Sequence, residues 1–93
     1  MSEESFTLSG PISRRPTARS PVIEGRRYRV WVRIGAISRG SVCVWVGGNR
    51  TEFFTAAGEH SRQIVAGDRM EVVVQGLNTD ARIDSVAVSE AAD

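Results

Sequence analysis

The chain has 93 residues and a mass of 10.1 kDa, enough for one small domain, and its 41% hydrophobic and 25% charged residues are typical of a globular protein. All twelve basic residues are arginine, which excludes a Schiff-base lysine and a P-loop lysine. With a single cysteine, Cys43, and a single histidine, His60, we expect neither an internal disulfide nor a His/Cys metal site.

The charges are unevenly distributed, although the net charge is only +1. Residues 10–50 hold nine arginines against one acidic residue, Glu24, whereas residues 51–93 hold three arginines against eight acidic residues. Such a chain can bind a polyanion, or its two halves can pair within the fold or across a subunit contact. No apolar run is long enough to span a membrane and no leader pattern is present, so we expect a soluble chain with no export signal and no membrane partner.

The first segment of the chain is predicted to be an extended arm. Ser9–Ser20 (SGPISRRPTARS) is rich in Ser, Pro and Arg, which favours an arm or a long loop over a helix or a central strand. Phe6 and Leu8 alternate with polar neighbours, so a short strand can precede it. We therefore divide the chain into an arm over residues 1–20, a β-sandwich over residues 21–90 and a short acidic tail over residues 91–93.

From Pro21 onward the hydrophobic pattern has a period of two, which predicts strands. Arg26–Ile34 alternates Tyr28, Val30, Val32 and Ile34 with arginines and Trp31, and Ser41–Val46 alternates three valines with Cys43 and Trp45. Further strands are predicted at Glu52–Ala56, His60–Val65, Met70–Gln75 and Ala81–Ser89. Glycines punctuate these runs, and no run has a helical period. The predicted fold class is all-β, a small antiparallel jelly-roll-like β-sandwich.

The first two predicted strands are expected to form an antiparallel hairpin. If their valines share the buried face, Val32 lies opposite Val44 and, on the other face, Trp31 lies opposite Trp45 and Arg33 opposite Cys43. A slip of one residue would bury arginines. The sequence therefore predicts a pair of tryptophans flanked by Arg29 and Arg33.

The pattern over most of the chain resembles a known group of domains. The relevant runs are GRRYRVWVRI (25–34), GSVCVWVGG (40–48), AGEH (57–60), VAGD (65–68) and IDSVAV (83–88). Together they resemble the carbohydrate-binding-module-like jelly-roll domains of tailed-phage and prophage structural proteins. This resemblance implies either a structural part of a particle or a glycan-binding module. The Arg-rich arm and the small size depart from such domains, which are usually appended to larger proteins.

The candidate binding residues fall into two groups. Trp31 and Trp45 with Arg29 and Arg33 suit a protein interface, a sugar-stacking platform or packing within the molecule, and all three interpretations remain open. The arm arginines, Arg14, Arg15 and Arg19, suit a protein anchor better than a nucleic-acid contact, because the planar guanidinium pairs bidentately with carboxylates.

The other polar residues are expected to be structural. Asp68, Asp80 and Asp84 have no calcium-loop spacing, so turn capping is favoured over a calcium site. His60 and Cys43 have no catalytic partner at a recognisable spacing, and Gly47-Gly48-Asn49 is a hairpin-type turn.

These features predict a non-enzymatic structural protein of a phage or phage-like particle, without a cofactor. Its expected role is capsid decoration or another head-associated role, with the arm anchored on the major capsid protein or another virion protein, and with copies of the chain forming a homo-oligomer. The alternative is a virion or tail-fibre module that binds host-surface glycan through the tryptophans. An OB-like single-strand nucleic-acid binder is the third, less favoured reading.

Overall fold

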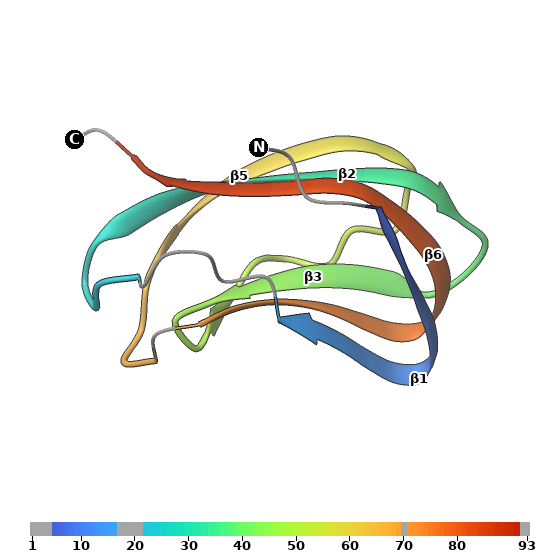
Figure 1. Ribbon diagram of the computed structural model, residues 1–93, viewed down its shortest axis with the longest axis horizontal. Coiled ribbons are helices and arrows are strands. Elements are labelled where there is room, and N and C mark those ends of the chain that lie inside the picture. Colours follow the sequence, from blue (N-terminus) through green and yellow to red (C-terminus); the bar gives the residue numbers. More distant parts are fainter. Residues whose placement is uncertain (1–4, 17–21, 70, 92–93) are drawn as a thin grey trace.

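A computed structural model of the chain describes residues 5–16, 22–69 and 71–91, and within them every regular element is an antiparallel strand (Figure 1). The strands are β1 (Phe6–Pro16), β2 (Arg27–Ile37), β3 (Ser41–Val46), β4 (Asn49–Arg50), β5 (Gly58–Val65) and β6 (Val72–Glu90). They form one sheet in the order β4-β3-β6-β2-β5, and β1 also pairs with β6. The all-β prediction is confirmed. No helix long and apolar enough to cross a membrane occurs in these residues.

The long strand β6 makes one sheet into two layers. Its first half pairs with β3, from Val72 opposite Val46 to Leu77 opposite Ser41, and its second half pairs with β2 as far as Glu90. Figure 1 shows β6 bending between these halves, so that β5, β2 and the end of β6 lie over β3 and the start of β6. We call these the upper and lower layers. The sheet thus curls over itself into a sandwich-like fold.

The bend of β6 has a local backbone cause. Val72 and Val74 are buried before it, whereas Thr79 and Ala81 are buried after it, so the inward-facing positions change from even to odd numbers. Asn78, with φ of 49°, lies between them and is the one non-glycine residue with positive φ in the described chain. A single left-handed residue turns the strand and exchanges its two faces, as in a β-bulge.

The connection between β2 and β3 holds this bend in place. The Ser38 backbone amide donates a hydrogen bond to the Asp80 carbonyl at 3.0 Å, and the buried Thr79 hydroxyl donates to the Arg39 carbonyl at 2.6 Å. Gly40, with φ of 72°, lies against the backbone carbonyls of residues 77 and 78, where a Cβ atom would collide with them. The bend is therefore fixed from both the strand and the loop.

The inner faces of the two layers form one hydrophobic core. As predicted, Val30, Val32 and Ile34 of β2 face inward with 1% exposure each, and the valines of β3 are fully buried. The remaining core residues come from β1, β2 and β6, from the segment before β2 and from the segments on either side of β5; they are Leu8, Val22, Tyr28, Phe54, Ala66, Val72, Val74, Ala81, Ile83 and Val86. Both predicted alternations are therefore confirmed.

Four predicted elements need correction. Ser9–Pro16 is no free arm or loop: it belongs to β1, which pairs with β6 from Phe6 opposite Ile83 to Pro16 opposite Val73. Proline is tolerated there because β1 is an edge strand, in which one side needs no ladder hydrogen bonds. Glu52–Ala56 contributes only an isolated bridge at Phe54, and the two predicted C-terminal strands are one continuous strand, β6.

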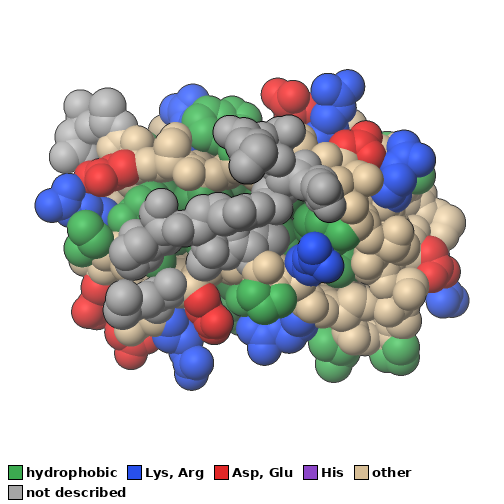
Figure 2. All heavy atoms as spheres, viewed as in Figure 1, with side chains coloured by type: hydrophobic (Ala, Val, Ile, Leu, Met, Phe, Trp, Pro, Cys, Tyr) green, Lys and Arg blue, Asp and Glu red, His purple; other side chains and the backbone are tan. Residues whose placement is uncertain are grey.

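Side chains close the two open sides of the sandwich. On one side the ring of His60 from β5 stacks on Phe54 at 4.6 Å, and Arg62 forms an ion pair with Glu52. On the other side the Arg15 guanidinium lies 5.1 Å from the Phe6 ring centroid. Figure 2 shows hydrophobic side chains between the layers, with charged side chains mainly around the rim.

Candidate functional site

The outer surface of the upper layer carries an exposed row of arginines around a tryptophan. Because Val30 and Val32 face the core, their neighbours on β2 face outward: Arg27, Arg29, Trp31 and Arg33. Opposite Trp31 stand only the small residues Ser61 of β5 and Ala87 of β6, and its side chain is half-buried. We call this surface the Trp31 face.

The Trp31 face is electropositive. The Arg29 guanidinium lies 5.8 Å from the Trp31 ring centroid, a cation–π contact. Arg27, Arg29 and Arg33 form no salt bridge with any described residue, and the one acidic residue paired with them across the strands is Glu59, opposite Arg33. Guanidinium groups without an ion-pair partner on the surface of a sheet can donate hydrogen bonds to carboxylates or other anionic groups of a binding partner.

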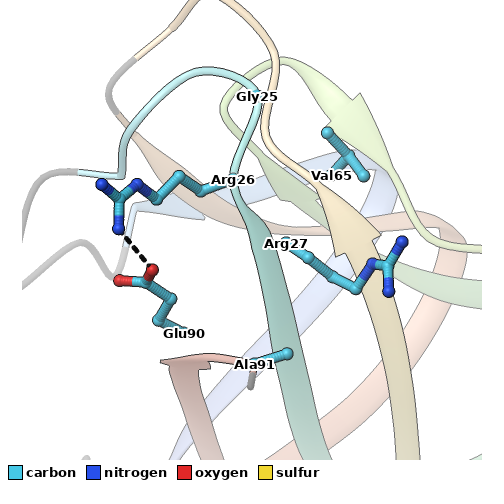
Figure 3. Close-up of a pocket in the computed structure, with 6 residues that line it drawn as sticks. All are labelled: Gly25, Arg26, Arg27, Val65, Glu90 and Ala91. Atoms are coloured by element: carbon cyan, nitrogen blue, oxygen red, sulfur yellow. Dashed lines mark hydrogen bonds and ion pairs between the residues drawn. The ribbon is translucent and has the colours of Figure 1, made fainter. Parts of the chain in front are cut away.

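The row leads to an open groove at one end of the molecule (Figure 3). The groove has a volume of about 390 Å³ and is lined by Gly25, Arg26, Arg27, Val65, Glu90 and Ala91. Figure 3 shows Arg26 reaching Glu90, with which it forms an ion pair of 2.7 Å, whereas Arg27 points away from this pair. The cation that remains uncompensated at the groove is therefore Arg27, which extends the Trp31 face.

The predicted pairing of the two tryptophans is wrong. β2 and β3 do not pair with each other: both pair with the same side of β6, one after the other, and so lie in different layers. Trp31 faces outward from the upper layer, and Trp45, on the opposite strand face from the buried Val44, faces outward from the lower layer. Arg33 consequently does not lie opposite Cys43. The two tryptophans cannot form one platform.

The three arm arginines have separate environments. Arg14 is exposed on the outer surface of the lower layer, opposite Gln75, whereas Arg15 stacks on Phe6 at the open side of the sandwich. Arg19 lies outside the described residues. β1 therefore presents Arg14 alone as a free basic side chain of this group.

His60 and Cys43 have structural positions, as the sequence indicates. His60 stacks on Phe54, and its Nε2 lies 2.8 Å from the Ala56 carbonyl oxygen. Cys43 is fully buried, and this burial raises the pKa of its thiol above the ordinary value, an effect partly opposed by the positive charges of Arg50 and Arg14.

Two of the three aspartates considered for calcium are bound by arginines. Asp80 pairs with Arg39 at 3.1 Å and Asp84 pairs with Arg82 at 3.0 Å. Within the described ranges, no group of three or more His, Cys, Asp and Glu residues has the proximity to hold a metal ion.

Two residues beside Trp45 were not identified from the sequence. Arg50 of β4 lies opposite Trp45, because Gly47 and Gly48, both with positive φ, form the two-residue turn of a hairpin. The turn itself was recognised, and extending its register by one pair would have found Arg50. Phe53 belongs to the predicted strand Glu52–Ala56, which forms only an isolated bridge at Phe54, so its contact with Arg50 does not follow from the sequence.

No protein-family model matches the chain, and no curated protein matches it.

Proposed function

We propose that the chain is a small, non-catalytic docking protein that attaches to a larger protein assembly through the Trp31 face. The observation that carries this proposal is a row of three arginines that form no ion pair with any described residue, beside a partly exposed tryptophan. Tryptophan and arginine contribute disproportionately to protein interfaces, and arginine forms charge-assisted hydrogen bonds with carboxylates. The partner surface therefore carries acidic groups that match Arg27, Arg29 and Arg33.

The assembly that we propose is a phage or phage-like particle, in which the chain is a decoration or head-associated protein on the major capsid protein or another virion protein. Support for this choice is the resemblance in strand and turn pattern to jelly-roll domains of phage structural proteins. The small domain also favours assembly, because contacts between copies add stability that a small core supplies only sparingly. Copies of the chain would accordingly form a homo-oligomer on the particle.

Glycan binding is the second candidate for the same face. Ser61 and Ala87 beside Trp31 leave room for a sugar ring to stack on the indole, with Arg29 and Arg33 available for hydrogen bonds to hydroxyl groups. In this case the chain would be a host-surface adhesion module of a virion or tail fibre. The two candidate functions use the same residues of the Trp31 face and differ in the ligand, which is an acidic protein surface in the first and a glycan in the second.

The experiment is a rebinding assay on purified particles. Particles from source cells are isolated on a density gradient, the copies of the chain per particle are counted by quantitative mass spectrometry, and stripped particles are mixed with added protein. We expect a fixed copy number, and about a tenfold or greater loss of rebinding for Trp31→Ala. Ile23→Ala, a control at an exposed apolar residue outside the Trp31 face, should rebind as the unaltered chain does.

Each other outcome contradicts the proposal in a defined way. Absence of the chain from all particles refutes the virion assignment. Rebinding that Trp31→Ala leaves unchanged refutes the assignment of the face. Retention of the chain on a glycan array, lost in Trp31→Ala, together with no rebinding to stripped particles, establishes the second candidate instead.

A further inference from the structure

The outer surface of the lower layer holds a second cluster of arginine and aromatic side chains. Its residues come from four neighbouring strands and the segment after β4; they are Ile12, Arg14, Trp45, Arg50, Phe53, Gln75 and Leu77, with Cys43 and Val73 on the same strand face but buried beneath them. We call this surface the Trp45 face. It lies on the opposite side of the sandwich from the Trp31 face and shares no residue with it.

Arg50 is held in place by aromatic rings at the centre of this cluster. Its guanidinium lies 4.3 Å from the Phe53 ring centroid and 5.9 Å from that of Trp45, and its Nη1 donates to the Thr51 carbonyl. The Trp45 indole is fixed in turn, because its Nε1 donates a hydrogen bond of 2.5 Å to the Gln75 side-chain oxygen. A guanidinium stacked on rings keeps its other N–H donors directed sideways, where they can bind an anion.

A second cation lies across the same face. Arg14 of β1 stands opposite Gln75, which stands opposite Cys43, whereas Arg50 stands opposite Trp45, two residues further along β3. The two arginines are therefore three strand spacings and two residues apart, roughly 16 Å between Cα atoms. Cys43 of β3 lies between them in the register of the strands, and the charges of both arginines oppose the rise in its pKa that burial causes. Gln75 lies between them in the sheet; its side-chain oxygen accepts from Trp45, and its amide group also carries N–H donors.

Among the described residues, no carboxylate forms an ion pair with these cations. The outward positions of the paired strands on this face contain no acidic residue, and neither Arg14 nor Arg50 forms a salt bridge with a described residue. The surroundings are apolar: Ile12 is 67% exposed and Phe53 is 40% exposed. A matching ligand therefore needs both anionic groups and apolar side chains.

We infer that the Trp45 face binds a short acidic segment of a partner protein, whose carboxylates pair with Arg14 and Arg50 and whose apolar side chains cover Ile12 and Phe53. A second copy of the same face is excluded as the partner by charge, because it would bring four arginines together without an acid. Nucleic acid fits less well, because its affinity grows with the number of phosphates neutralised and only two cations are present. Together with the proposed docking through the Trp31 face, this binding would let the chain connect two partner proteins, one on each layer.

Trp45 itself can report on the binding. The chain has two tryptophans, so the full-length variant Trp31→Phe retains Trp45 as the only one, and its fluorescence is followed on titration with a short peptide of alternating Glu and Leu. We expect a saturable change that is absent with the peptide in which each Glu is replaced by Gln. In the same background, Arg50→Gln should weaken binding about tenfold or more, and Arg50→Lys should weaken it by less, because the charge remains while the planar fork is lost.

The control separates this surface from the proposed docking face. Arg33→Gln removes the same charge from the Trp31 face and should leave the titration unchanged. Equal binding of the Glu and Gln peptides, or equal binding by folded Arg50→Gln, overturns the inference. Tighter binding of an oligothymidylate than of the Glu peptide also overturns it, and identifies a nucleic-acid surface. Failure of particle rebinding leaves the inference intact, because that assay depends on Trp31.

Discussion

Replacement of Asn78 tests the explanation of the bend in β6. The residue has φ of 49°, and its side chain is exposed, so a substitution changes the backbone preference with little loss of packing. A non-glycine residue in the left-handed region costs about 1–2 kcal/mol, which asparagine reduces through local hydrogen bonds and glycine avoids. Asn78→Ala should therefore lower the free energy of unfolding by about 1 kcal/mol, and Asn78→Val by more, because a β-branched side chain is hindered further at this φ.

Asn78→Gly is the matched control. Glycine relieves the strain but loses more chain entropy on folding, so its free energy of unfolding should stay within about 0.5 kcal/mol of that of the unaltered protein. The assay is urea or thermal denaturation followed by tryptophan fluorescence, with Trp31 and Trp45 reporting on different layers. For a domain of this size, 1 kcal/mol corresponds to about 4–8 °C in Tm. Equal stability of Asn78→Ala and the unaltered chain, or equal losses for the Ala and Gly variants, would refute the reasoning.

Three further predictions concern the buried polar groups and the same bend. Gly40→Ala should lower the free energy of unfolding by at least about 2 kcal/mol in denaturant titration, because φ is positive and the added Cβ meets backbone carbonyls. Thr79→Val should lower it by about 1–2 kcal/mol, because the Arg39 carbonyl loses its donor. Burial raises the pKa of Cys43 in the folded state, so the neutral thiol stabilises the fold fully below about pH 8.5, and this stabilisation is lost as the pH rises through the raised pKa. Cys43→Ala should therefore show a smaller decrease in Tm at alkaline pH than the unaltered chain.

The inward-facing residues could be predicted from the sequence because burial imposes a period of two. In β2 and β3 a shift of one residue would have buried arginines, so the assignment of Val30, Val32 and Val44 to the core had no alternative. The same argument shows that Trp31 and Trp45 face outward. It does not show which strand lies beside which, because the period is identical for every pairing partner.

The predicted elements were wrong where the local amino-acid composition favours a loop or turn but the segment is paired with another strand. Pro11 and Pro16 in the β1 sequence favour a loop, yet an edge strand leaves half of its backbone groups unpaired and accepts them. Gly76 and Asn78 have the composition of a turn, and Asn78 does adopt a turn conformation, but within a continuous strand. The consequence for function is large, because a bend instead of a turn sends β2 and β3 into different layers and separates the tryptophans.

Separation of the two faces has an energetic consequence that can be measured. Their side chains point away from each other on layers that pack about 10 Å apart, and they share no hydrogen bond or ion pair among the described residues. Changes at such distant sites are additive within about 0.5 kcal/mol. For a connector, the combined variant Trp31→Ala with Arg50→Gln should lose affinity for each partner by the amount that the corresponding single variant loses. A coupling free energy above about 1 kcal/mol would mean that one partner contacts both faces. The chain would then be enclosed by a single partner and would not connect two partners.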